Sequence, residues 1–113
     1  IAWHNQAFAE IFGDYDLLLT PTVATAAFPL ERNPELIAGR KVDPWWGFTP
    51  FCMHANLTGQ PAASLPCGLT SGRTPVGIQI VGKIGDELSV LQASAAYEKA
   101  HPWQSNEPAR YNN

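Results

Sequence analysis

Few side chains of this 113-residue sequence could do chemistry together. His54 and Cys67 are the one suggestive pair, because an imidazole within hydrogen-bond reach can activate a thiol as a nucleophile. Such a couple also needs an electropositive setting. The competing interpretation is structural, with a helical histidine satisfied by a neighbour and a buried thiol at the end of a strand. We expect the structural alternative.

Metal binding and disulfide formation are not indicated. Cys52 and Cys67 form no C-x-x-C motif and the three histidines are scattered, so zinc spacing is absent and we expect no metal and no other cofactor. Two thiols in a sequence that opens without a secretion signal fit a reducing compartment, and we expect a cytoplasmic protein. A disulfide between the two cysteines is the less favoured alternative.

Charge is sparse and unevenly placed. Charged residues make up 15% of the chain, against roughly 25% in an ordinary domain, and none lies between Asp43 and Arg73. The net charge of −3 without a basic cluster speaks against nucleic-acid binding, and no apolar run reaches the roughly 18 residues of a membrane helix. Because charges normally mark solvent-facing segments, the uncharged stretch predicts burial against more protein or the lining of a pocket.

The elements that must position these residues begin with a helix and a strand. Residues 2–12 are predicted as a helix with one apolar face, and Gly13 as the left-handed residue that follows it. Residues 16–20 are apolar almost throughout, which is typical of a strand buried on both faces. Pro21 is predicted to end this strand, because it cannot donate a ladder hydrogen bond.

A long connection over residues 23–46 comes next. A connection of this length is usually functional or packed on a neighbour, and within it only residues 34–40 could form a short helical turn. Residues 47–58 are predicted as a helix, with Gly59 in the left-handed position after it.

The remaining segments predict a hairpin and a final helix. Residues 61–66 and 76–82 are the two strands, and Gly77 removes a side chain where another backbone must come close. Asp86 is predicted to cap a helix that runs to Ala100. Leu88, Leu91 and Ala95 are predicted to line one face of this helix, with the charged residues elsewhere.

Taken in order, four of these segments resemble the C-terminal quarter of the amidase signature enzymes. They are residues 15–22 (YDLLLTPT), 56–68 (NLTGQPAASLPCG), 75–82 (PVGIQIVG) and the helix opening at 86–87. The resemblance implies an α/β fold, namely the C-terminal part of an α/β/α sandwich with a mixed sheet and helices packed on it. Residues 1–113 are expected to form one piece of such a domain, with 101–113 as a loosely ordered tail.

The resemblance also implies hydrolysis of carboxamides by a serine nucleophile, a second serine with a cis peptide bond, and a lysine. The family's Gly/Ser-rich loop lies upstream of the region that resembles this chain, and the five serines here are isolated. No catalytic residue is therefore assigned. The expected role is to complete the sheet and to wall the substrate cleft of a larger amidase, without catalysis by this piece alone.

Trp46, Phe48 and Thr49 are the candidate substrate-binding residues. The resemblance places their segment at the wall of the acyl-binding cleft, although the aromatic side chains could equally belong to the core. Glutamine-dependent relatives that serve transfer-RNA amidation carry an Asp near the position of Thr49. Because a desolvated ammonium group needs a paired charge, Thr49 favours an apolar or aromatic amide over free glutamine.

Two alternative functions stay open. The chain could be a stand-alone remnant that self-associates through an exposed strand edge and an apolar patch, which would make a homodimer. It could instead be part of a glutamine-dependent transfer-RNA amidotransferase, similar to the A subunit of such an enzyme. For the favoured function, the expected partners are the remainder of the amidase chain and a small amide substrate, with no nucleic acid and no membrane.

Overall fold

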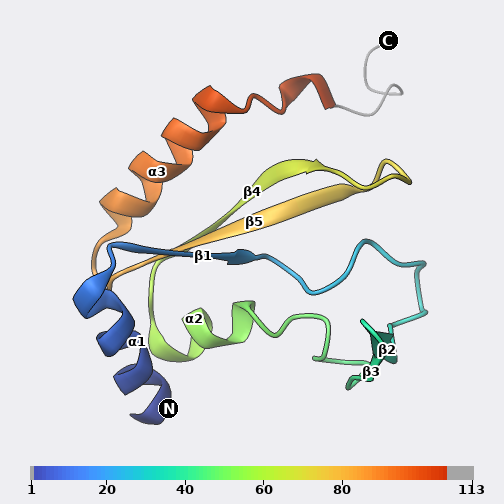
Figure 1. The fold of residues 1–113 in the computed structure, drawn as a ribbon, viewed down its shortest axis with the longest axis horizontal. Helices are drawn as coiled ribbons and strands as arrows, with labels where there is room; N and C mark the ends of the chain where they lie inside the picture. The colour runs from blue at the N-terminus through green and yellow to red at the C-terminus, as the bar shows by residue number, and fades with distance from the viewer. Residues whose placement is uncertain (1, 107–113) are drawn as a thin grey trace.

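The computed structural model describes residues 2–106. The elements follow the order α1 (Ala2–Asp14), β1 (Leu17–Pro21), β2 (Leu36–Ile37), β3 (Arg40–Lys41), α2 (Cys52–Thr58), β4 (Ala62–Leu69), β5 (Pro75–Gly82), α3 (Glu87–Ala100) and the 3-10 helix η1 (Gln104–Asn106). Helix α3 lies on one side of the sheet, and α1 and α2 lie on the other (Figure 1). This arrangement confirms the α/β class with helices packed on a sheet.

The main sheet has three strands in the order β1-β5-β4. Both pairs are antiparallel: Leu19 lies opposite Ile80, and β4 and β5 form the predicted hairpin with an irregularity between Pro66 and Gly68. The described strands therefore contribute only antiparallel pairs to the sheet. Strands β1 and β4 each have one edge unpaired within the described residues.

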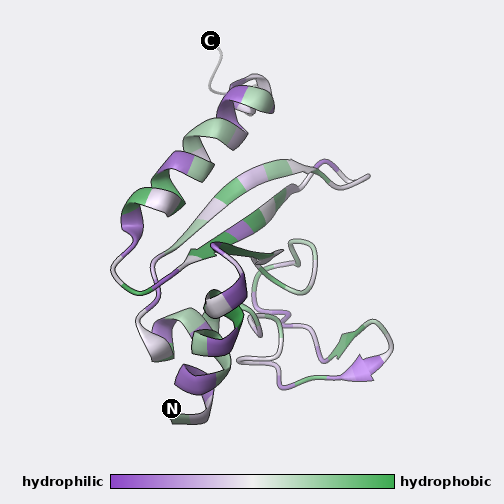
Figure 2. Ribbon diagram, turned by 60° about the vertical axis from the view of Figure 1, so that its left-hand side comes forward, coloured by the Kyte–Doolittle hydropathy of each residue, from purple (hydrophilic) through white to green (hydrophobic). Residues whose placement is uncertain are grey.

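The core lies between the sheet and the α1–α2 layer. Phe8 and Phe12 from α1 pack with Ala55 from α2 and Val81 from β5, and Leu18 joins them from β1. Apolar and polar residues alternate along β4 and β5 (Figure 2), which directs one set of side chains to each helical layer. Fully burying a phenylalanine, leucine or valine side chain stabilises the fold by roughly 1.5–3 kcal/mol.

The contact of α3 with the sheet centres on Val90, which is buried. A Cβ atom at Gly82 would lie only 2.6 Å from Val90 Cγ2, so the glycine provides the hollow that receives the helix. The apolar face predicted for Leu88, Leu91 and Ala95 is not the one that packs on the sheet, because the two leucines are 64% and 65% exposed among the described residues. The helical periodicity identified one apolar face of α3, but the space above Gly82 receives Val90, which lies outside that face.

Two predicted boundaries near the N-terminus need correction. Gly13 lies inside α1, which continues to Asp14, because the Tyr15 N–H still donates to the Ile11 carbonyl at 2.9 Å. The strand at β1 is confirmed and includes Pro21 as its last residue. Among the described residues only one face of β1 is covered: Leu18 packs against the core, and Leu19 on the opposite face is 59% exposed.

The long connection contains a small hairpin rather than a helical turn. Strands β2 and β3 are joined through Ala38 and Gly39, whose φ values are 49° and 76°. Two consecutive left-handed residues make the type of tight turn that suits a hairpin. The predicted helical turn at 34–40 is therefore wrong, because the left-handed backbone at these two positions reverses the chain.

Helix α2 is shorter than predicted. The Asp43 carboxylate accepts hydrogen bonds from the N–H groups of Trp45 and Trp46 at 2.8 and 3.0 Å, which hold residues 43–46 in a turn, and the helix begins only at Cys52. Gly59 follows α2 with a φ of 79°, as predicted. Of the predicted tail, residues 104–106 form η1 and 107–113 lie outside the described residues.

Asp86 caps α3 as predicted, and its carboxylate accepts a hydrogen bond from the Ser89 N–H at 3.2 Å. The hydroxyl of Ser89, followed by its N–H, holds the pKa of Asp86 below its ordinary value of 3.8. A group with a lowered folded pKa stabilises the fold above its unfolded pKa, and this contribution is lost as the pH falls through the folded pKa.

We therefore expect the melting temperature of Asp86→Asn to fall less than that of the wild type as the pH falls below 3.8, through the lowered pKa of the folded Asp86 carboxyl, because a neutral amide oxygen keeps the cap at every pH. The melting temperature measured against pH checks this. Glu31→Gln, a neutralised exposed loop residue, should follow the wild-type acid slope. Identical slopes for wild type and Asp86→Asn would contradict the capping argument.

None of the helices described between residues 2 and 106 combines the length and apolarity needed to cross a bilayer.

Candidate functional site

A groove of about 590 Å³ opens where the long connection returns to the sheet. This volume lies within the range of roughly 300–1,000 Å³ that small-molecule sites occupy. The described residues that line it are neutral, and most are apolar: Pro21, residues 23–28, Phe48, Phe51, Thr70, Pro75, Val76 and Gly77. The groove is therefore suited to an uncharged, largely apolar ligand, because a charged group would lose its hydration there without gaining a paired charge.

One wall of the groove is a strap formed by residues 22–28, of which residues 23–28 line the groove, and hydrogen bonds attach the first residues of the strap to two other segments. The Thr22 N–H donates to the Gly77 carbonyl at 3.0 Å, and the Ala24 N–H donates to the Phe48 carbonyl at 3.0 Å. The Cys52 thiol donates to the Thr22 carbonyl at 3.0 Å. The strap is thus attached both to β5 and to the segment that leads into α2.

The rings of Phe28, from the strap, and Phe48, from the segment before α2, are in contact with each other. Their ring centroids lie 5.1 Å apart with an interplanar angle of 74°, which is the edge-to-face geometry that aromatic pairs prefer. Both side chains are half-buried and both line the groove. The pair leaves part of each ring accessible from inside the groove.

The buried side chain of Gln79 links β5 to Phe51, in the segment that leads into α2. Its side chain is only 5% exposed, and its amide nitrogen donates to the Thr20 hydroxyl at 3.0 Å and to the Phe51 carbonyl at 3.1 Å. Because Phe51 lines the groove, this buried amide holds one wall of the groove against β5.

Gly77 lies at the point where the strap meets the sheet. The hydroxyl groups of Thr22 and Ser64 are hydrogen-bonded at 2.7 Å, and a Cβ atom at Gly77 would lie 2.7 Å from Thr22 Oγ1 and 3.0 Å from Ser64 Oγ. The close approach predicted at this glycine is confirmed. The approaching atoms are two side-chain hydroxyls, however, and not the backbone that the sequence suggested.

The candidate substrate-binding residues are distributed unevenly around the groove. Phe48 lines it. Trp46 is 65% exposed and lies outside the lining, as does Thr49, whose hydroxyl donates to the Trp46 carbonyl at 3.1 Å. Sequence reasoning missed Phe28, although the sequence also has no charged residue between Asp16 and Glu31, which was a signal for a second segment that lines a pocket or is buried.

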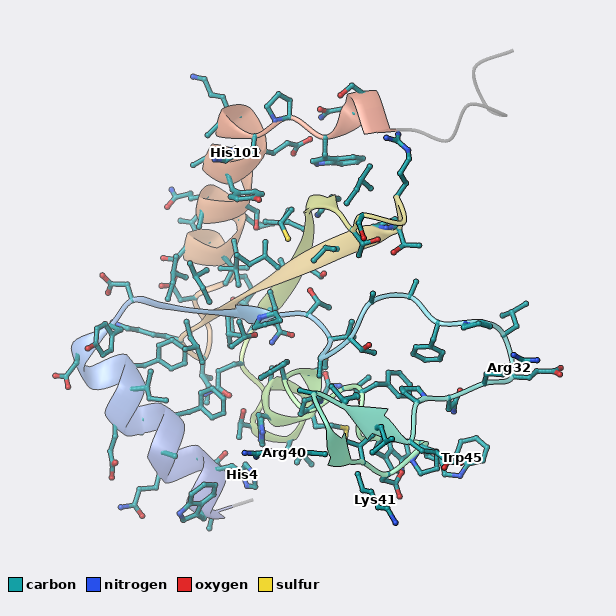
Figure 3. The ribbon with its side chains drawn as sticks, turned by 45° about the vertical axis from the view of Figure 1, so that its right-hand side comes forward. His4, Arg32, Arg40, Lys41, Trp45 and His101 are labelled. Carbon is teal, nitrogen blue, oxygen red and sulfur yellow. The ribbon has the colours of Figure 1, made fainter. Side chains whose placement is uncertain are left out.

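The cationic residues of the long connection lie away from α3. Figure 3 shows Arg32, Arg40 and Lys41 on the arm that carries the β2–β3 hairpin, with Trp45 close to that hairpin. These cations are absent from the described groove lining. The arrangement leaves the groove itself without a basic group that could attract an anionic substrate.

His54 and Cys67 do not form a couple. The His54 ring packs 5.0 Å from that of His4 in the α1–α2 layer, whereas Cys67 on β4 lines a small pocket with Tyr97 and His101 on the α3 side. Cys67 is exposed rather than buried, and both cysteines are free thiols. Within the described part of the chain, no three His, Cys, Asp or Glu side chains gather in a way that could hold a metal ion.

Comparison with known proteins identifies the family. The family model for amidases matches residues 3–91, which covers every wall of the groove. The chain belongs to the amidase family. The match confirms the resemblance to amidase signature enzymes, and it includes both the strap and the β4–β5 hairpin.

Among curated relatives, this amidase chain is similar to the A subunit of the glutamyl-tRNA(Gln) amidotransferase of Thermodesulfovibrio yellowstonii, with 38% identity over 89% of the chain and 20% of that protein. A bacterial aryl acylamidase of the amidase signature family has a similar structure, with a TM-score of 0.82 and 35% identity over 91% of this chain and 22% of that one. A 6-aminohexanoate cyclic dimer hydrolase gives a TM-score of 0.81 and 30% identity, covering 96% of this chain and 24% of that one.

The amidase chain spans about a fifth of the length of the curated relatives it matches, and it corresponds to their C-terminal portion.

Proposed function

We propose that these residues are the C-terminal portion of an amidase that uses water to hydrolyse the C–N bond of a neutral, apolar or aromatic carboxamide, which releases a carboxylic acid and ammonia, or an amine where the amide is N-substituted. The observation that carries the proposal is the groove, whose described lining holds three phenylalanines and no ionisable side chain. In this proposal the portion walls the substrate cleft and completes the sheet, while the reacting groups come from the rest of the chain.

Phe48 is the proposed substrate-contacting residue of this portion, because it lines the groove and pairs with Phe28. Trp46 and Thr49 are proposed as neighbours that complete the wall when the remainder of the chain is present. The hydrogen bonds of Thr49 to the Trp46 carbonyl fix the turn that precedes α2, so these two residues would act through the placement of Phe48 and Phe51.

The remainder of the amidase chain is the proposed partner of the apolar surface. Large apolar side chains are exposed on β1 and along α3, where Leu19, Leu88 and Leu91 are each more than half exposed. Patches of this kind are usually covered by more protein. A cytoplasmic location is also part of the proposal, supported by the two free thiols.

A second candidate is the A subunit of a transfer-RNA amidotransferase, which the names of the curated relatives favour. Such a protein would act on glutamine, whose ammonium and carboxylate groups need charged partners once desolvated. The described groove lining offers none. We therefore place this candidate second.

The deciding experiment compares substrates on the full-length protein that contains these residues. Benzamide, a linear aliphatic amide and free glutamine are supplied separately, and release of ammonia is measured. We expect turnover of the two neutral amides, with little or none of glutamine. Turnover of glutamine alone would favour the amidotransferase, and no turnover of any amide would contradict the proposal.

Sedimentation tests the third alternative, a self-associating remnant. The full-length protein is compared with the isolated 113-residue chain at several concentrations. Concentration-dependent self-association of the isolated chain without any amide turnover by the full-length protein would favour that alternative over the amidase.

A further inference from the structure

We propose that Phe28 is a specificity-determining residue, and that its ring and that of Phe48 form an aromatic clamp for the ring of an aromatic carboxamide. This inference rests on the proposed amidase function and adds to it the feature of the substrate that is recognised. Phe28 comes from the long connection, about twenty residues before the turn in which the sequence suggested that substrate contacts would lie.

The geometry of the two rings suits recognition of a third ring. Their centroids are 5.1 Å apart and their planes differ by 74°, so the two rings contact each other edge to face and leave no space for a third ring between them. Both rings also line the groove, and because an aromatic ring carries a negative face and a positive edge, an incoming ring can pack against the part of the pair that the groove exposes. A saturated ring of the same size fills the same space but lacks this complementarity.

The strap that carries Phe28 is anchored at Ala24, four residues before it, and Pro29 restricts the backbone on the other side. The strap is anchored by the hydrogen bond from the Ala24 N–H to the Phe48 carbonyl, 3.0 Å long, and this bond joins the two segments that carry the clamp. Pro29 follows Phe28 directly, and a residue before proline is restricted to extended conformations. A clamp held in this way loses little conformational freedom on binding.

The charges around the clamp indicate a neutral occupant. The described lining contains no Asp, Glu, Lys or Arg, and the nearest charged residues in the sequence, Glu31 and Arg32, lie beyond Pro29 and are exposed. Figure 3 shows Arg32 at the outer end of the long connection. An uncharged ring therefore fits the clamp better than an ionised side chain does.

The test measures kcat/KM of the full-length protein for benzamide and for cyclohexanecarboxamide, which match in size and differ in aromaticity. We expect Phe28→Leu to lower the benzamide-to-cyclohexanecarboxamide ratio about fivefold to tenfold, because leucine keeps the apolar bulk and removes the ring. Phe28→Ala should lower the same ratio, and it should also lower kcat/KM for both substrates, because contact area with the substrate is lost.

Leu30→Ala is the matched control, because Leu30 lies on the same segment and is 94% exposed. Its ratio should equal that of the wild type. Thermal unfolding of each variant establishes that it is folded, and Phe28→Leu serves as the test if Phe28→Ala does not fold. An unchanged ratio in a folded, active Phe28→Leu variant would overturn the clamp and leave the amidase proposal standing. A wild type that hydrolyses neither amide would overturn both.

Discussion

Replacing Gly77 with alanine is expected to destabilise the protein by about 1–3 kcal/mol, and replacing it with valine by more, because the site has no room for a side chain. An added Cβ atom would lie 2.7 Å from Thr22 Oγ1 and 3.2 Å from Thr22 Cβ. Rotation of the Thr22 side chain would break its hydroxyl bond to Ser64, and a shift of its main chain would break the bond from its N–H to the Gly77 carbonyl. Either form of relief therefore costs a hydrogen bond that attaches the strap to the sheet.

Gly72 provides the matched control for this substitution. It lies in the hairpin turn between β4 and β5, and a Cβ atom there would meet only Thr70 Oγ1, at 3.7 Å. Gly72→Ala should change the free energy of unfolding by less than about 0.5 kcal/mol. Urea denaturation of the full-length protein measures both variants. A Gly77→Ala variant as stable as Gly72→Ala would refute the close-approach argument.

Gln79→Ala is the second change with a large expected effect, about 2–4 kcal/mol of destabilisation. The substitution removes the donor of the Phe51 carbonyl and the partner of the Thr20 hydroxyl, both on half-buried residues, and it deletes a side chain that is 5% exposed. Each lost hydrogen bond costs about 0.5–1.5 kcal/mol, and the deleted side-chain atoms add a cavity. Since Phe51 also lines the groove, KM for a neutral amide should rise.

A second variant separates the loss of hydrogen bonds from the loss of side-chain volume, and a third serves as the control. Gln79→Met keeps much of the side-chain volume and removes the hydrogen bonds, so it should retain most of the loss in stability if the bonds dominate. Gln92→Ala removes an exposed glutamine from α3 and should lie within about 0.5 kcal/mol of the wild type. Differential scanning calorimetry ranks the three variants by melting temperature. Equal melting temperatures for Gln79→Ala and Gln92→Ala would show that the hydrogen bonds of Gln79 to Thr20 and Phe51 do not stabilise the fold.

Together these residues connect the sheet to the site. The two β5 positions Gly77 and Gln79 lie on the same strand face, and each one contacts a segment that walls the groove. One allows the strap to approach, and the other holds the Phe51 main chain. The shape of the groove therefore depends on β5, although β5 contributes only its first residues to the lining.

Several features of the molecule could be predicted from the sequence because their causes are local. The hairpin of β4 and β5 follows from two extended segments joined by a turn, and the start of α3 follows from the capping carboxylate of Asp86. Gly59 ends α2 because a left-handed residue is needed there. The order of these segments also carried the resemblance to amidases, which the family match confirms.

Other features depend on contacts between segments far apart in the chain. The apolar stripe of α3 was visible in the sequence, but the hollow at Gly82 determines that Val90 packs on the sheet. The groove could not be located either, because Phe28 meets Phe48 only in the folded chain, where Thr22 bonds to Gly77 of β5 and Ala24 bonds to the Phe48 carbonyl.

The sequence by itself therefore determined the family, the α/β class and the order of most elements, since these depend on propensities, caps and motifs within short stretches. The tertiary structure alone decided which faces pack and which aromatic rings meet, because these depend on the space left between distant segments. The pairing of Phe28 with Phe48 is the clearest case, since neither residue carries a local signal for the other.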